Sequence, residues 1–493
     1  MRSSIGILIT TLSLGAQAQP TLDWVNNLGG FAFADRAFGV SADSADHTYV
    51  GGYFSRATDF DPGPGVVELT PSSPEDPYLA KYDRHGDLVW VRHLAGLGRI
   101  TDIAVDSQDA VIAAGIYGSD LVVDATLTLS AVATYDIFFV KFDESGNLVW
   151  GRSISGNGSH SPQAVAVDSN DALLMSGLVG LTADLDPGPG TFEVTAGIDF
   201  DSFIAKFDSS GDFVWGHLFT QLSASGVAQS DSAHGLVVDP QDNVYLAGQY
   251  EGQVDFNGTV LDAGGVDAYL AKFSHAGALQ WVSSTENDGL RTEHFALGID
   301  GQNRLYAAGV YFGETDFDPS PVAEAIGNSD GTLDAYLVSY EPDGAFRWVR
   351  LFELAGSILD MVVAGDGTVT LGGQFSGVVD FDPGPDLQER AAISTQDCFF
   401  AQYNASGEFK NVQHLEGSPG SLGQATCAVE ALAQAPQNDI VMAGHYRRSV
   451  DFDPGPGERI LTPVGTTNGF VARYDQPLVA QIFSNGFEQA AGN

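Results

Sequence analysis

The side chains most able to do chemistry in this sequence are aspartates that recur in pairs. The pattern Asp-aromatic-Asp-Pro-Gly first occurs at residues 59–63 and returns four more times with small changes. Proline holds the residue before it in an extended conformation, so both carboxylates of a pair should project to the same side. The pairs are Asp59 and Asp61, Asp184 and Asp186, Asp316 and Asp318, Asp380 and Asp382, and Asp451 and Asp453.

Two interpretations of these pairs stay open. Hard Ca²⁺ ions favour clustered carboxylates and loop carbonyls, which makes the loops candidate calcium sites and calcium the one cofactor that the sequence suggests. A single motif has too few oxygens for the roughly six to eight ligands of calcium, and it lacks the full Asp-x-Asp-x-Asp-Gly spacing. In the structural alternative, each aspartate accepts backbone N–H groups in an Asx-type turn ahead of Pro-Gly.

The elements that must position these loops come from an internal repeat. Two markers each recur seven times, at intervals of about sixty to seventy residues, which is typical of repeat architectures. The first marker is a glycine after an apolar run: Gly52, Gly115, Gly177, Gly248, Gly309, Gly373 and Gly444. The second is an aromatic residue that ends a short strand: Tyr82, Phe142, Phe207, Phe273, Tyr340, Tyr403 and Tyr474.

Tryptophans form a third marker, because most units continue from the aromatic residue to a glycine and then a tryptophan four residues later. The sixth unit has Asn411 instead, and the seventh has neither residue. Trp24 lies near the N-terminus, in a segment that matches the strand missing from the seventh unit. We interpret six tryptophans as packing residues of outer strands: Trp24, Trp90, Trp150, Trp215, Trp281 and Trp348.

Each unit is predicted to form four short strands, such as 235–239, 244–250, 268–273 and 279–282 in the fourth unit. Repeated four-stranded sheets around an axis make a β-propeller. We therefore predict an all-β fold, a seven-bladed β-propeller with four antiparallel strands per blade. The N-terminal strand would complete the last blade and close the ring, which removes an exposed sheet edge. The propeller should span residues 19–478, followed by a tail at 479–493.

The units resemble the secreted bacterial β-propeller repeats often called SBBP repeats. The segments that carry the resemblance are 238–245, with the sequence VDPQDNVY, and 139–150, with the sequence FVKFDESGNLVW. The resemblance covers roughly residues 21 to 478. It implies a propeller fold and says little about activity.

The acidic motifs lie between the second and third strands of their units, so we expect them to crown one face of the disc. Loops on a rigid scaffold often carry function. The leading hypothesis is a non-catalytic exported binding or scaffold protein, whose acidic loop face takes a cationic, glycan or protein ligand. The rival is a calcium-dependent hydrolase or lyase, or a quinoprotein-like enzyme, since Asp-x-x-Gly-x-x-x-Trp loosely resembles the tryptophan-docking segment of quinoprotein dehydrogenases. A pocket of convergent Asp, His and Tyr would favour the enzyme.

Composition narrows the classes of partner. The chain has 21 Lys and Arg against 64 Asp and Glu, a net charge of −43, which excludes the basic stripe that nucleic-acid binding needs. Hydrophobic residues make up 44% of the chain, which is enough to form sizeable cores. Four of the five lysines directly precede the strand-ending aromatic residue, and we expect them to pair with turn aspartates: Lys81, Lys141, Lys206 and Lys272.

Residues 1–18 have the pattern of a secretory signal, with Arg2, a short apolar run and Ala16-Gln17-Ala18. We therefore expect a secreted monomer without a membrane span. Export permits a disulfide between the two cysteines, Cys398 and Cys427, which should lie toward the same rim of neighbouring blades; two free thiols are the alternative.

Overall fold

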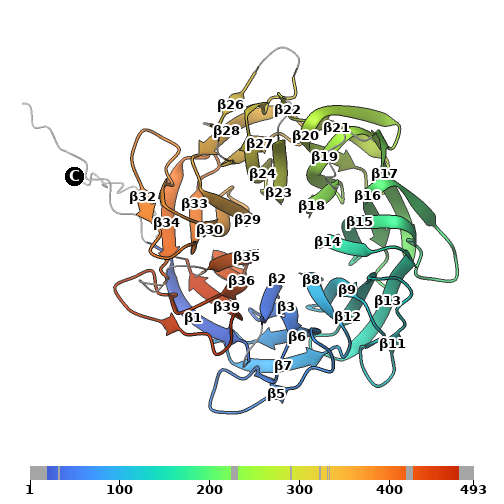
Figure 1. Ribbon diagram of the computed structural model, residues 1–493, viewed down its shortest axis with the longest axis vertical. Helices are drawn as coiled ribbons and strands as arrows, with labels where there is room; N and C mark the ends of the chain where they lie inside the picture. Colours follow the sequence, from blue (N-terminus) through green and yellow to red (C-terminus); the bar gives the residue numbers. More distant parts are fainter. Residues whose placement is uncertain are drawn as a thin grey trace, which may run out of the picture.

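The computed structural model describes residues 19–30, 34–223, 231–288, 291–320, 324–329, 331, 333–417 and 426–476. Across these ranges the regular structure is β-strand, apart from one short 3-10 helix at Pro436–Asn438. Figure 1 shows the strands gathered into small sheets around a central axis, which is a β-propeller. The predicted signal segment 1–18 and tail 479–493 lie outside the described residues.

Three sheets have four strands each, all paired antiparallel. The sheet of the first unit contains β2 (Arg36–Ala42), β3 (Thr48–Phe54), β6 (Asp76–Tyr82) and β7 (Leu88–His93). That of the sixth contains β29 (Gly356–Val363), β30 (Val369–Phe375), β33 (Asp397–Tyr403) and β34 (Phe409–Leu415). That of the seventh contains β35 (Cys427–Gln434), β36 (Ile440–Tyr446), β39 (Asn468–Asp475) and β1 (Thr21–Leu28).

The second to fifth units belong to one continuous sheet, in which the same pattern of four strands recurs. The second unit has β8 (Gly98–Val105), β9 (Val111–Tyr117), β12 (Asp136–Phe142) and β13 (Leu148–Asn157). The third has β14 (His160–Val167), β15 (Leu173–Asp184), β16 (Glu193–Phe207) and β17 (Phe213–Ser223). The fourth has β18 (Ser232–Val238), β19 (Val244–Phe256), β20 (Thr259–Phe273) and β21 (Leu279–Ser284), and the fifth has β23 (Arg291–Ile299), β24 (Leu305–Phe312), β27 (Asp334–Tyr340) and β28 (Phe346–Phe352).

Short strands between the second and third strands of a unit form hairpins. They are β4 (Thr58–Asp59) with β5 (Glu68–Leu69), β10 (Leu121–Val122) with β11 (Thr128–Leu129), β25 (Glu314–Asp316) with β26 (Ile326–Asn328), β31 (Val378–Asp380) with β32 (Glu389–Ala391), and β37 (Val450–Asp451) with β38 (Ile460–Leu461). In addition, β22 (Glu286–Asn287) pairs with β25.

The first strands of the units follow one another around the axis, and β35 of the seventh unit lies beside β2 of the first. On the outside of the seventh unit, β1 pairs antiparallel with β39 and brings Trp24 opposite Arg473. This is the pairing that the sequence predicts for the closing strand. Three of its apolar side chains are buried, Trp24, Val25 and Leu28, and so is Asn26.

A bulge in the first strand explains the marker glycine. In the first unit the pairing of β2 with β3 shifts between Ala37 and Gly39, and a Cβ on Gly52 would lie 1.9 Å from the carbonyl oxygen of Arg36. At each marker glycine a Cβ would lie 1.8 to 2.3 Å from a first-strand carbonyl oxygen. Only glycine therefore fits beside the bulge.

The tryptophans join neighbouring units. Trp90 donates its indole N–H to the carbonyl of Glu144 in the next unit, at 3.0 Å. Its ring lies 2.9 Å from where a Cβ of Gly146 would be, and Gly146 has φ +76°. Indole N–H groups of four further tryptophans make the same contact with the following unit: Trp24, Trp150, Trp215 and Trp348. Trp281 packs beside Gly344, but its N–H has no hydrogen-bond partner among the described residues.

Three of the four lysines pair with turn aspartates as predicted, and Lys272 has no such ion pair among the described residues. Lys81 lies 3.0 Å from Asp43 and also donates to the carbonyl of Glu144 in the next unit. Equivalent pairs join Lys141 to Asp106 and Lys206 to Asp168. Lys272 donates to the carbonyl of Pro342. In the described residues, no helix is long and apolar enough to cross a membrane.

Candidate functional site

The paired aspartates hold their own loops. Asp59 Oδ1 accepts the backbone N–H groups of Asp61 and Val67, at 3.1 and 2.8 Å, and Asp61 Oδ1 accepts that of Gly63 at 2.8 Å. The other four pairs repeat these contacts at 2.7 to 3.1 Å. One oxygen of each aspartate is thus engaged in the Asx-type turn that the sequence allows.

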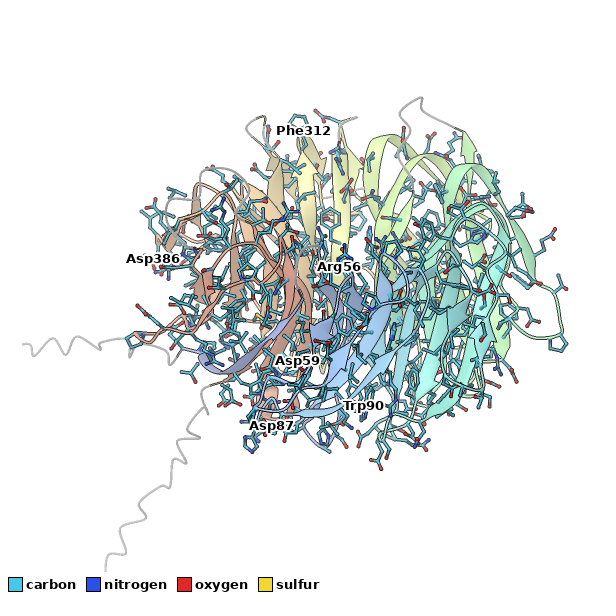
Figure 2. The ribbon with its side chains drawn as sticks, turned by 60° about the horizontal axis from the view of Figure 1, so that its bottom comes forward. Arg56, Asp59, Asp87, Trp90, Phe312 and Asp386 are labelled. Atoms are coloured by element: carbon cyan, nitrogen blue, oxygen red, sulfur yellow. A yellow bond between two sulfur atoms is a disulfide. The ribbon has the colours of Figure 1, made fainter. Side chains whose placement is uncertain are left out.

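The acidic loops lie at the circumference of the ring, which differs from the predicted crown on one face. Figure 1 places β5 and β32, which belong to two of these loops, outside β7 and β34. In Figure 2, Asp59 lies between Arg56, near the end of β3, and Asp87, in the turn at the opposite end of the blade. The loop folds back because Phe60 is buried against Tyr78 and its carbonyl accepts the hydroxyl of Tyr82, at 3.1 Å.

The same loops join neighbouring units. In the pairing of their strands, Asp184 lies opposite Ser155 of the preceding unit, and Asp316 lies opposite Glu286. The backbone N–H of Asp451 donates to the carbonyl of Glu416, at 2.9 Å. Over the described ranges, no three His, Cys, Asp or Glu side chains converge in a way that could hold a metal ion. The contacts therefore assign the paired aspartates a structural role, and calcium binding stays a prediction.

The two cysteines join the sixth and seventh units. Cys398 on β33 and Cys427 on β35 form a disulfide, with their Cα atoms 5.0 Å apart. At this junction Asn411 replaces the docking tryptophan, and Leu478 stands four residues after Tyr474, where the other units have glycine. A covalent link thus occurs where tryptophan docking is missing.

Sequence reasoning missed a set of buried aspartates in the third strands, which stand at the first residue of the strand in four units and inside longer strands in two. They stand six residues before the strand-ending aromatic residue in six units, and this spacing was the available signal: Asp76, Asp136, Asp201, Asp267, Asp334 and Asp397. Asp76 accepts the N–H groups of Ser72 and Ser73 and lies 2.6 Å from His93 Nε2. Burial alone would raise the pKa of Asp76, but these hydrogen bonds lower it below its ordinary value. Asp136, Asp201 and Asp397 also accept N–H groups from the loop before them. These four aspartates therefore hold the ends of their hairpin loops.

The candidate functional site is a pocket of about 330 Å³ on the face where the first strands begin, between the second and third units. The beginnings of β8 and β14 form two of its walls, and β9, β15 and β16 add the others. Two backbone hydrogen bonds hold these walls: Gly98 N–H donates to Glu75 O and His160 N–H donates to Tyr135 O, both at 2.9 Å. Sequence reasoning did not find this site, because its residues come from three units.

Four ionisable side chains line this pocket: Glu75, Arg99, Tyr135 and His160. His160 is 1% exposed, and neither of its ring nitrogens has a hydrogen-bond partner within the described part of the chain. Burial lowers the pKa of His160, so its imidazole is neutral at neutral pH. Arg99 and Glu75 are half-buried, and their side chains make no hydrogen bond or ion pair with any residue that the structure describes. Such unpartnered polar groups are typical of ligand pockets.

Two further carboxylates have strongly perturbed pKa values. Asp102 and Asp360 hold equivalent places after the bulge of β8 and β29, and each accepts an N–H of the next unit, from Val165 at 2.7 Å and Leu432 at 2.6 Å. Burial raises the pKa of both carboxyls to about 7, although the hydrogen bonds act in the opposite direction. Both groups thus join neighbouring first strands.

We predict that this raised pKa makes stability depend on pH near neutrality. A carboxyl with a raised folded pKa stabilises the fold while it is protonated, and this contribution is lost as the pH rises through about 7. The comparison protein is a variant with Asp102→Asn and Asp360→Asn. When the pH is lowered from about 8 to about 6, the unfolding free energy of wild type should rise by about 2 kcal/mol more than that of this variant.

Urea unfolding of both proteins at each pH measures this gain. The histidines whose pKa is lowered by burial, His160, His234 and His294, oppose the gain below about pH 6.5. They are present in both proteins and cancel in the comparison. Equal pH dependence of the two proteins would contradict the prediction.

Comparisons with known proteins agree with the fold and assign no family. The chain matches no protein-family model, so membership of the SBBP repeats stays a prediction. An uncharacterized WD repeat-containing protein of Acanthamoeba polyphaga mimivirus is 22% identical over 340 residues, which are 55% of this chain and 23% of that protein. The regulatory protein FlaEY of Caulobacter vibrioides is 27% identical over 142 residues, 29% and 14% of the two chains. These alignments span less than a quarter of the length of either relative.

Solved structures with low similarity include a streptogramin B lyase and the WD40 repeats of RRP9. The lyase has a TM-score of 0.40 at 6% identity, over 91% of this chain and 97% of that one. The WD40 repeats have a TM-score of 0.39 at 9% identity, over 92% and 98%. At these TM-scores neither structure bears on function.

Proposed function

We propose that this chain is an exported, seven-bladed β-propeller that binds a small ligand in the pocket between its second and third units. The observation that carries the proposal is the pocket itself, where a buried imidazole and an arginine both lack partners among the residues that the structure describes. Seven blades are supported by the seven marker glycines and by the closed succession of first strands. Export is supported by the pattern of residues 1–18.

The position of the pocket supports binding. Its residues lie at the ends of β-strands in a packed scaffold, where side chains are held in place before a ligand arrives. A buried polar atom without a partner costs free energy, and a ligand that supplies the missing hydrogen bond recovers it. The acidic loops, in contrast, already have partners within the fold, and we propose that their main role is to link blades.

A ligand screen tests the binding function on a chain that starts at residue 19. Saccharides, small organic acids, amino acids and calcium salts are added singly while thermal unfolding is followed. At about a hundredfold excess over its Kd, a bound ligand should stabilise the fold by about 2.7 kcal/mol and raise the Tm by a few degrees. Leu178→Trp, which fills the pocket, should abolish this shift.

Leu222→Trp is the matched control, because it adds the same side chain to an exposed position on β17. The calcium arm also uses a variant with Asp59→Asn and Asp61→Asn, which tests the first acidic loop. The proposed function falls if no compound raises the Tm, or if Leu178→Trp leaves every shift unchanged.

A lyase or hydrolase reaction in the same pocket is the second candidate function. The observation that favours it is His160, since a neutral imidazole with free nitrogens can accept a proton from a bound molecule. Release of product from a bound compound, lost in His160→Gln while binding persists, would establish an enzyme. Binding without turnover would support the non-catalytic function.

A further inference from the structure

The pocket between the second and third units is lined by one acidic and one basic side chain, Glu75 and Arg99, which do not form an ion pair with each other. We propose that its ligand is a free α-amino acid with an apolar side chain, whose carboxylate binds Arg99 and whose ammonium group binds Glu75. This inference rests on the proposed binding function and specifies its ligand class.

Arg99 is suited to the carboxylate. The chain has 43 more acidic than basic formal charges, yet this guanidinium has no acidic partner in the described part of the chain. It is half-buried, and guanidinium groups bind carboxylates through two parallel hydrogen bonds. An arginine left unpaired in so acidic a protein indicates that an anionic group of a ligand completes the site.

Glu75 is suited to the ammonium group. Its carbonyl accepts the N–H of Gly98, the residue before Arg99, so the backbone holds the two charged residues beside each other. The side chains are nevertheless not joined as an ion pair, and both line the pocket. The neutral ring of His160 lines the same pocket, and the nearby Asp136 adds negative charge. Glu75 therefore gives the pocket a group that favours a cationic atom of a ligand.

The rest of the pocket has a largely apolar wall, to which Tyr135, Ser159 and Ser161 add polar groups. Leu97, Ile116, Leu178 and Phe200 line it, and the volume of about 330 Å³ is at the small end of ligand pockets. An aliphatic or aromatic side chain of one amino acid fits such a volume and loses contact with water there. A ligand with only an anionic group would leave Glu75 unpaired and would meet the negative field of the whole protein.

Isothermal titration with matched probes tests the inference. L-phenylalanine and L-leucine are zwitterions, N-acetyl-L-phenylalanine keeps only the negative charge, and L-phenylalaninamide keeps only the positive charge. Wild type should bind a zwitterion at least about tenfold more tightly than either single-charge probe, because each of these leaves one pocket charge unpaired.

Two variants assign the charges. Arg99→Met should weaken zwitterion binding and remove the preference over L-phenylalaninamide, while Glu75→Gln should remove the preference over N-acetyl-L-phenylalanine. If both variants keep the wild-type Tm and each loses its preference over a different single-charge probe, misfolding is excluded as the cause. Equal affinity of wild type for all three types of probe would overturn the inference.

The failure of this inference is distinguishable from that of the proposed function. If saccharides bind in the pocket and Leu178→Trp blocks them, while amino acids do not bind, the ligand class is wrong and the binding function stands. If no compound binds wild type at all, both fall.

Discussion

A chain that lacks residues 19–28 is expected to lose most of its folding free energy. Without β1 the edge of β39 is exposed, and the burial of Trp24, Val25 and Leu28 is lost. Each of these side chains contributes about 1.5 to 3 kcal/mol when fully buried. Together they contribute about 5 to 9 kcal/mol, comparable to the roughly 5 to 15 kcal/mol by which a typical protein is stable.

Urea unfolding and light scattering measure this loss. The shortened chain should unfold at lower urea and associate through its open sheet edge. A synthetic peptide of residues 19–30 added in trans should restore both properties, and a scrambled peptide should not. If the shortened chain kept the wild-type unfolding midpoint, closure by β1 would not be what stabilises the ring.

Replacing both cysteines, Cys398→Ala with Cys427→Ala, is expected to destabilise the protein by about 3 to 4 kcal/mol. The disulfide joins residues 29 apart, and closing a loop of this length in the unfolded chain accounts for a loss of that size. The junction has no docked tryptophan to compensate, since Asn411 takes that place. Alanine is chosen because both positions are buried.

Reductant provides the control for this prediction. Dithiothreitol should lower the unfolding free energy of wild type toward that of the double variant, and it should leave the variant unchanged. A reduced wild type as stable as the oxidised protein would show that the disulfide is not needed at this junction.

Much of the propeller could be predicted because its signals are local and repeated. The marker glycine recurs because a first-strand bulge places a carbonyl where a Cβ would be, as at Gly52 and Gly309. Trp24 could be assigned to the seventh unit because that unit lacked a strand and the N-terminal segment matched it. These inferences need only short patterns and a count.

The position of the acidic loops could not be predicted in the same way. The motif indicates an Asx-type turn correctly, since the aspartates contact N–H groups two to nine residues away. Where the turn lies depends on Tyr82, which is 22 residues from Phe60 and draws the loop back along its blade. The predicted crown on one face was drawn from strand order alone, without this contact.

The pocket depends entirely on tertiary structure. Glu75, Arg99 and His160 belong to different units, and none has a repeated spacing that marks it as a ligand group. The periodic pattern specifies which strands pair and that sheets surround an axis, because these depend on neighbours in the chain. Which unrepeated side chains meet between two sheets depends on how the sheets pack and where their loops return, and this is decided only once the ring has formed.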